Sequence, residues 1–200
     1  MNLRIIIPVK PFAEAKQRLA PALNHAERAQ IAERMFRHVL RTAALAFGAS
    51  DLLVVSRSRD VLAIAEKEGA CCFVESAPSD LNAALQQAAR FAKSNGTPKL
   101  FVLASDLPLL GASDLTDIFS YDCAIAPDRH DRGTNALCWP HLPFAFGEDS
   151  FARHRDAAEN AGLIPQIVRR RGLACDIDVP TDLVDIYPNF ARSSGITRSA

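Results

Sequence analysis

Residues 100–108 read LFVLASDLP, an uninterrupted apolar run that ends in an aspartate and a proline. A short segment that is apolar at every position is typical of a strand buried on both faces of a sheet. Similar runs occur at 3–9, 52–56 and 70–75, and helical patterns at 24–47, 60–68 and 80–94 separate them. This alternation predicts an α/β fold, a Rossmann-like three-layer sandwich with a mostly parallel sheet.

The helix boundaries carry their own signals. Asn24 with Glu27 three residues later has the pattern of a capping box, and Gly48 ends the longest apolar repeat. Beyond residue 106 we expect a short helix near 113–120, strands at 123–127 and 135–139, a helix at 150–160, a strand-like stretch before 175 and a short helix from 181. We see no linker, so we predict one domain over residues 1–188 and a polar tail at 189–200.

Composition narrows the class of protein. The 200 residues are 48% hydrophobic and 23% charged, and 23 Lys and Arg balance 23 Asp and Glu. This balance favours neither nucleic acid nor a membrane surface as a partner. The first apolar run is too short for a signal peptide, and the five cysteines lack CxxC or other metal-ligand spacing. We therefore expect a cytoplasmic protein with reduced thiols.

Acidic residues follow two of the expected strands. Asp106 follows the apolar run at 100–104 after a single serine, and Asp176 and Asp178 precede Pro180 near the end of the chain. Parallel sheets bind ligands at the carboxyl ends of their strands, and Mg²⁺ prefers one or two carboxylates together with substrate phosphates. The pattern predicts a magnesium site at Asp106 with Asp176 or Asp178, although an aspartate in such a turn can also be a simple cap.

A basic loop follows the first strand. Pro8 opens the loop, and Lys10, Lys16 and Arg18 supply positive charge for a triphosphate, unless the loop is merely solvated. No Gly-rich phosphate-binding pattern accompanies it. Asn82, in the first turn of the helix at 80–94, could contact a base or ribose.

An anion site is expected before the helix at 150–160. Gly147 and Ser150 bracket its start, where free backbone N–H groups bind anions, or where Ser150 only caps the helix. His130 and His154 lie in the same regions and are expected to contact a ligand rather than carry protons.

Six segments in order resemble the 2-phospho-L-lactate guanylyltransferase family, CofC in archaea and FbiD in actinobacteria. They are IPVKPFAEAKQRL at 7–19, DLNAAL at 80–85, SDLPLL at 105–110, APDRHDRGTNAL at 126–137, FGEDSFARH at 146–154 and DIDVPTDL at 176–183. The resemblance implies a glycosyltransferase-A-like nucleotidyltransferase fold and a Mg²⁺-dependent transfer of GMP from GTP. The acceptor would be 2-phospho-L-lactate, phosphoenolpyruvate or 3-phospho-D-glycerate, and the product would serve the biosynthesis of coenzyme F-420. A homodimer is also suggested.

The resemblance also assigns roles. It implies that Asp106 and Asp178 hold the metal, with Lys16 beside them in catalysis. The nucleotide side would comprise Pro8, Lys10, Lys16, Arg18 and Asn82, and the acceptor side Thr134, Asn135, Gly147, Ser150 and His154. Two alternatives stay open: a related nucleotidyltransferase for another phosphorylated acceptor, such as a molybdopterin or a sugar phosphate, and a non-catalytic nucleotide-binding protein. The second alternative would require neither aspartate.

Overall fold

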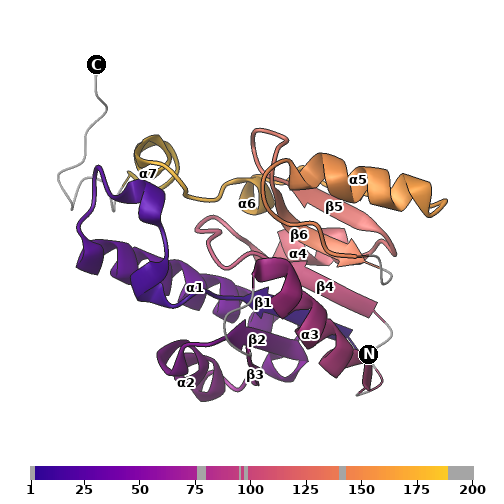
Figure 1. The fold of residues 1–200 in the computed structure, drawn as a ribbon, viewed down its shortest axis with the longest axis horizontal. Coiled ribbons are helices and arrows are strands. Elements are labelled where there is room, and N and C mark those ends of the chain that lie inside the picture. The colour runs from indigo at the N-terminus through magenta and orange to yellow at the C-terminus, as the bar shows by residue number, and fades with distance from the viewer. Residues whose placement is uncertain (1–2, 76–79, 95, 97–98, 140–142, 189–200) are drawn as a thin grey trace.

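A seven-stranded sheet forms the centre of the computed structural model, which describes residues 3–75, 80–94, 96, 99–139 and 143–188 (Figure 1). The strand order is β3-β2-β1-β4-β6-β5-β7. The strands are β1 (Leu3–Pro8), β2 (Leu52–Ser56), β3 (Cys71–Val74), β4 (Lys99–Leu103), β5 (Ala124–Pro127), β6 (Thr134–Trp139) and β7 (Gln166–Ile167). Among these strands only β6 runs against its neighbours, so the predicted mostly parallel α/β sheet is confirmed.

The reversed direction of β6 follows from the length of the loop before it. Six residues, 128–133, join β5 to β6. A parallel connection requires a crossover of a dozen or more residues, whereas a short loop is sufficient for an antiparallel pair. The hairpin therefore places the start of β6 at the same edge of the sheet as the carboxyl ends of β1, β4 and β5.

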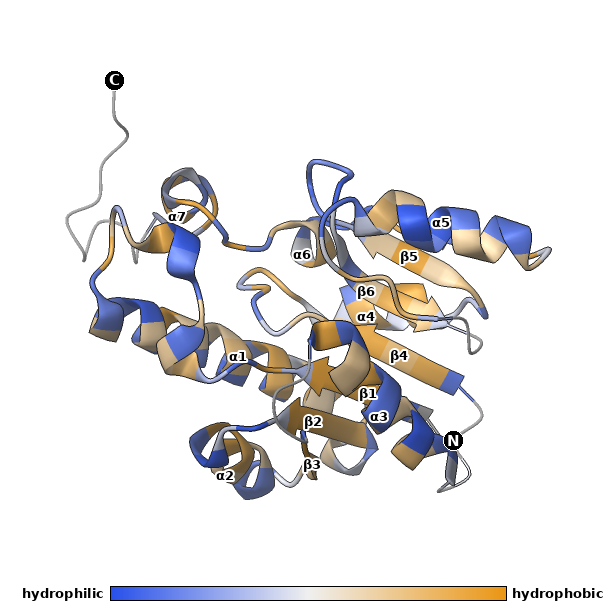
Figure 2. Cartoon of the chain, viewed as in Figure 1, coloured by the Kyte–Doolittle hydropathy of each residue, from blue (hydrophilic) through white to orange (hydrophobic). Residues whose placement is uncertain are grey.

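Helices cover both faces of the sheet. One face packs against α1 (His25–Phe47), α2 (Arg59–Lys67), α4 (Ala112–Phe119) and α6 (Arg171–Ala174), and the other against α3 (Leu81–Ser94) and α5 (Ser150–Asn160). Within β1, Ile5 and Ile7 belong to the first core cluster and Ile6 to the second, as the two-residue repeat of a strand requires. Figure 2 shows strands that are mostly hydrophobic between helices of mixed character.

A third apolar cluster joins the two ends of the chain. Leu19 follows the loop after β1, Ile31 lies in α1, and Ile177 and Leu183 flank the start of α7 (Pro180–Ile186); all four are fully buried. Because this cluster packs α7 against the loop after β1, it brings residues 176–178 to the sheet edge that carries the basic loop.

Several local predictions are confirmed. The Asn24 side chain accepts a hydrogen bond from the Glu27 amide at 3.0 Å, and the Glu27 carboxylate accepts from the Asn24 amide at 2.8 Å. Gly48 ends α1 with φ +102°, and the α5 bounds agree with the expected 150–160. All five cysteines are free thiols.

The structure corrects two local expectations. Asp149 occupies the N-cap position of α5 with φ +52°, so Ser150 is the first helical residue rather than the cap. The expected strand-like stretch before 175 is also wrong: the two-residue β7 ends at Ile167 and the short helix α6 follows, so Asp176 and Asp178 come after a helix rather than a strand. Four residues with a glycine carry too little periodicity to indicate that helix. The expected tail at 189–200 lies outside the described residues. None of the helices in the described part of the chain has the length and apolar content that a membrane span needs.

Candidate active site

The strand ends surround a cavity of about 1010 Å³. It is lined by the loop after β1, the ends of β2 and β4, the 128–135 hairpin, the 146–150 loop and the segment before α7. Ten of the twelve predicted site residues line it: Pro8, Lys10, Lys16, Arg18, Asp106, Thr134, Asn135, Gly147, Ser150 and Asp178. Asn82 and His154 lie behind its wall.

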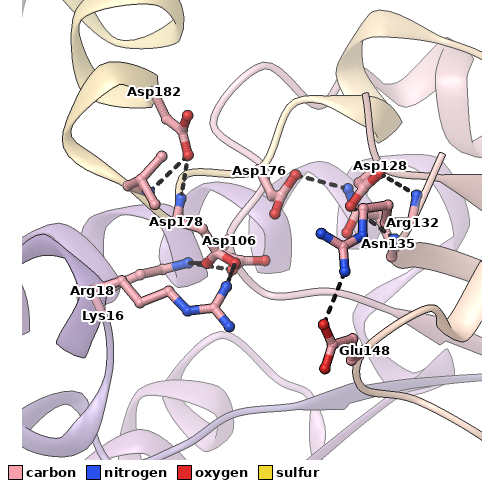
Figure 3. Close-up of polar contacts among 12 residues, drawn as sticks. Lys16, Arg18, Asp106, Asp128, Arg132, Asn135, Glu148, Asp176, Asp178 and Asp182 are labelled. Carbon is pink, nitrogen blue, oxygen red and sulfur yellow. Dashed lines mark hydrogen bonds and ion pairs between the residues drawn. The ribbon is translucent and has the colours of Figure 1, made fainter. Parts of the chain in front are cut away.

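Two aspartates distant in sequence meet at one buried ammonium group (Figure 3). Lys16 Nζ donates a hydrogen bond to Asp106 Oδ2 and lies 3.1 Å from Asp178 Oδ1, and its side chain is only 8% exposed. Burial alone would lower the pKa of Lys16, but the charges of Asp106 and Asp178 and the hydrogen bonds to them outweigh burial and raise it above the ordinary value. Lys16 is therefore a charged, buried part of the cavity, which contradicts the alternative of a merely solvated loop residue.

The Lys16 backbone is held in an unusual conformation. Its φ of 55° and ψ of 39° lie in the left-handed region, where a residue with a Cβ atom is uncommon. Lys16 directly precedes the 3₁₀ turn Gln17–Leu19, whose Leu19 is anchored in the third apolar cluster. The packing of Leu19 thus fixes the turn that directs Lys16 towards the two aspartates.

A third carboxylate belongs to the acidic group. Burial and the nearby charges of Asp106 and Asp178 raise the pKa of Asp176 from 3.8 to about 6, against the opposing hydrogen bond from Asn135 and the charge of Lys16. The Asn135 amide nitrogen lies 3.3 Å from Asp176 Oδ1 and 3.0 Å from the Leu173 carbonyl oxygen. Three carboxylates so close together repel one another and attract cations.

The acidic segment before α7 is held by residues that sequence reasoning did not assign. Asp182, 3% exposed, accepts hydrogen bonds from the backbone N–H groups of Asp178 and Val179 at 2.7 and 2.8 Å. Arg129 forms an ion pair with Asp182 and donates to the Asp176 carbonyl oxygen at 3.3 Å. The sequence signal was present: Pro180 at the first helical position and an acidic residue two positions later are typical of a capped helix start.

The acidic pair fits a divalent cation. Asp106 and Asp178 already share one positive charge, the Lys16 ammonium, so both carboxylates reach a single point. In the described residues no three His, Cys, Asp or Glu side chains converge as a complete metal site. In nucleotide sites Mg²⁺ is typically bound by one or two carboxylates, and phosphate oxygens and water supply its other ligands.

The opposite wall of the cavity is built around Asp128 and Arg132. The Asp128 carboxylate accepts hydrogen bonds from the backbone N–H groups of His130, Arg132 and Gly133 at 2.8–2.9 Å, which closes the hairpin loop. The Arg132 guanidinium in turn bonds Glu148 at 2.9 Å and Asp149 at 3.1 Å. The hairpin loop and the 146–150 loop therefore form one connected wall (Figure 3).

Two predicted contact residues support this wall from behind. The Asn82 amide donates to the Phe146 carbonyl oxygen at 3.0 Å and accepts from the Phe146 N–H at 2.8 Å. His154 is fully buried between Thr134 and Ala145. Their predicted ligand contacts stay predictions, but both side chains hold the wall.

The cationic loop is only partly engaged with the aspartates. Arg18 lies 3.6 Å from Asp178 with a side chain that is 77% exposed, and Lys10 is exposed at the cavity rim. Arg57, at the end of β2, also lines the cavity and pairs with Glu14. The rim thus offers positive charge next to the acidic centre, as a bound triphosphate requires.

Comparison with known proteins agrees with this arrangement. Residues 3–190 match the family model described as "Guanylyl transferase CofC like". The chain is 37% identical to the phosphoenolpyruvate guanylyltransferase of Chloroflexus aggregans, over 87% of this chain and 91% of the relative. It is 32% identical to the 2-phospho-L-lactate guanylyltransferase of Methanobrevibacter smithii, over 90% and 82% respectively.

A solved structure shares the fold. A protein of Desulfovibrio desulfuricans G20, assigned to the nucleotide-diphospho-sugar transferases, superposes with a TM-score of 0.71 at 18% identity, covering 96% of this chain and 89% of its own. This likeness confirms the nucleotidyltransferase type of fold that the resemblance implied. With a family match over nearly the whole chain, the protein belongs to the CofC-like guanylyl transferase family.

Proposed function

We propose that this enzyme transfers GMP from GTP to the phosphate of a small phosphorylated acid and releases pyrophosphate. The acceptor is 2-phospho-L-lactate, phosphoenolpyruvate or 3-phospho-D-glycerate, and the product serves coenzyme F-420 biosynthesis. The relatives named as guanylyltransferases of the first two acids support this reading. The free thiols favour a reducing compartment, so we place the reaction in the cytoplasm.

One observation carries the proposal: Asp106 and Asp178 meet at Lys16 on the floor of the cavity. A protein that only binds a nucleotide can do so with positive charge alone and requires neither carboxylate. A transferase needs them, because a Mg²⁺ ion held by Asp106 and Asp178 would neutralise the charge that develops on the phosphates.

Lys16 completes this half of the site. Its ammonium is buried and charged, and Asp106 and Asp178 take two of its three N–H donors, which leaves one for a ligand in the cavity. When a nucleotide is bound, Lys16 can donate to a non-bridging phosphate oxygen and hold the triphosphate in line for displacement. Lys10 and Arg18 at the rim attract the distal phosphates.

The other wall suits the acceptor. Thr134, Gly147 and Ser150 line it, and the hydroxyls of Thr134 and Ser150 are its donors for an anion. The backbone N–H groups of Ser150 and Phe151 at the start of α5 already donate to the carbonyl oxygens of Gly147 and Arg132. The acceptor's phosphate oxygen attacks the α-phosphorus of GTP; a new P–O bond forms as the bond from the α-phosphorus to the bridging oxygen breaks, and pyrophosphate leaves.

The chemistry needs no general base. A phosphate monoester is largely dianionic at neutral pH because its second pKa is about 6. The fully buried His154 has both ring nitrogens engaged by protein groups and is not available to take a proton. Rate acceleration therefore rests on positioning and charge neutralisation.

Pyrophosphate release tests the proposal. The protein is incubated with GTP, Mg²⁺ and each of the three acids in turn, with a sugar phosphate and ATP as controls for the acceptor and the base, and with a chelator in place of Mg²⁺. We expect release with GTP and at least one acid, and none after chelation. Release with the sugar phosphate alone would support the alternative transferase, and no release with any acceptor would support a non-catalytic binding protein.

A further inference from the structure

His154 joins three segments of the acceptor wall. It lies in α5 and is fully buried. Its Nδ1 is 3.0 Å from Thr134 Oγ1, and its Nε2 is 3.0 Å from the backbone nitrogen of Ala145. The imidazole therefore connects α5 with the first residue of β6 and with the loop that precedes α5.

The partners of the two ring nitrogens determine where the proton lies. A backbone N–H can only donate, so Nε2 must be the unprotonated nitrogen that accepts from Ala145. A neutral imidazole then carries its proton on Nδ1 and donates it to Thr134 Oγ1. Burial, with a smaller contribution from the charge of Arg153, lowers the pKa of His154 to about 4, so the ring is neutral at neutral pH.

This tautomer sets the polarity of Thr134. Because Oγ1 accepts from His154, the hydroxyl hydrogen is left to point elsewhere, and in the described ranges of the chain Oγ1 has no second protein partner. Thr134 lines the cavity. Its hydroxyl is thus a donor towards the cavity, which suits a carboxylate or phosphate oxygen, groups that only accept.

Aromatic side chains fix the ring in this orientation. Trp139 and Phe146 both meet the imidazole edge-on, with ring centroids 5.5 and 4.8 Å away and interplanar angles of 69°. Asn82 holds Phe146 through two backbone hydrogen bonds. A ring flip that exchanged Nδ1 and Nε2 would have to disturb these packed neighbours, so the donor role of Thr134 is built into the wall.

We propose that His154 is a positioning residue of the acceptor site: as the Nδ1–H tautomer it orients the Thr134 hydroxyl as a fixed donor to an anionic group of the phosphorylated acid. This inference rests on the proposed function, because it needs an acid at Thr134. It assigns His154 a role through Thr134 and Ala145 rather than the direct ligand contact expected from the sequence.

The two amide replacements of His154 separate its two hydrogen bonds. Asparagine places an amide near the position of Nδ1 and keeps a donor for Thr134, whereas glutamine reaches the position of Nε2 and keeps an acceptor for Ala145. Thr134→Val removes the hydroxyl with little change in shape. Binding of phosphoenolpyruvate, or of whichever of the three acids binds most tightly, is followed by the fluorescence of Trp139, the single tryptophan of the chain.

We expect His154→Gln and Thr134→Val each to weaken acid binding roughly tenfold, the size of one lost hydrogen bond to a charged group. His154→Asn should bind within threefold of the wild type. In the Thr134→Val background, His154→Gln should add less than a twofold loss, because a residue that acts only through a hydroxyl has no effect once that hydroxyl is gone. The KM for GTP should stay within twofold in every variant.

Several results would overturn the inference: an unchanged affinity in His154→Gln, an equal tenfold loss in the Thr134→Val background, or a parallel rise in the GTP KM. If the Gln variant does not fold, the Asn variant decides, since a tenfold loss there contradicts a donor role at Nδ1. If the wild-type protein binds the acid but releases no pyrophosphate, the proposed function is wrong and the inference about His154 is not affected. If the wild-type protein turns over normally and His154→Gln leaves the acid affinity unchanged, the inference about His154 is wrong and the proposed function is not affected. If none of the acids binds, both are wrong.

Discussion

His154 should make the stability of this protein fall in mild acid, and His154→Asn should remove that effect. Burial and the charge of Arg153 lower the pKa of His154 from 6.5 to about 4 in the folded state. A group with a lowered folded pKa contributes stability that is present above its unfolded pKa and is lost as the pH falls through the folded pKa. The pH window is therefore about 6.5 down to 4.

The size of the loss follows from those two values. Proton linkage gives a decrease in the free energy of unfolding of about 2 kcal/mol at pH 5 and about 3 kcal/mol at pH 4, relative to pH 7.5. Asp176 has the opposite sign, because its pKa is raised to about 6 and its burial penalty is relieved as it becomes protonated. Asp176 would offset roughly 1 kcal/mol of the His154 effect at pH 5 in the wild type.

The comparison of wild type with His154→Asn removes the Asp176 contribution, because both proteins carry it. Urea unfolding, followed by Trp139 fluorescence at pH 7.5, 6 and 5, gives the difference in unfolding free energy at each pH. We expect this difference to shift in favour of the variant by about 2 kcal/mol between pH 7.5 and 5. A difference that stays constant within about 0.5 kcal/mol would show that His154 is not held neutral by its surroundings.

Three further perturbations test the remaining parts of the site. Asp106→Asn should lower the rate of pyrophosphate release about 10²-fold or more, as expected when one preorganised charge is removed. Asp122→Asn is the control and should leave that rate unchanged, because the Asp122 carboxylate is fully exposed and pairs with Lys99 away from the cavity. Ser150→Ala should raise the acceptor KM and leave the GTP KM as it is; the reverse pattern would exchange the two halves of the site. Asp176→Asn should raise the free energy of unfolding by about 3 kcal/mol at pH 7.5 and by almost nothing below pH 4, because the raised pKa opposes folding only while the carboxyl is ionised. An equal gain at both pH values in denaturant titrations would contradict that cause.

Patterns within one segment predicted much of this fold. The apolar runs and the Asn24–Glu27 pair define β1, β2, β4 and α1 locally, and the rule that ligands bind at strand ends directed attention to Asp106. These features depend on residues that are neighbours in sequence, so they can be predicted from the amino-acid sequence alone.

The missed features depend on segments that meet only in three dimensions. Lys16 was predicted as a site residue, but its burial against Asp106 and Asp178 was not, because Leu19 and α7 create it from distant segments. Sequence reasoning left Asp176 and Asp178 as alternatives, whereas the structure brings both near Asp106 and distinguishes them by burial and by the hydrogen bond from Asn135. Neither the burial of Lys16 nor the difference between Asp176 and Asp178 can be predicted from the residues next to them in sequence.

The distribution of charge in the cavity explains how one neutral protein can bring two anions together. On the side proposed for the nucleotide, the Asp106–Lys16–Asp178 group can hold a cation and the basic residues of the rim attract phosphates. On the opposite wall Arg132 is already paired with Glu148 and Asp149, so the groups left for an acid are the uncharged donors Thr134, Gly147 and Ser150. Uncharged donors can orient a dianionic phosphate without neutralising it, which preserves the charge that makes its oxygen a nucleophile. In the proposed reaction, the wall that lowers charge and the wall that retains it are therefore built from different chemistry, which keeps the acceptor phosphate nucleophilic without a general base.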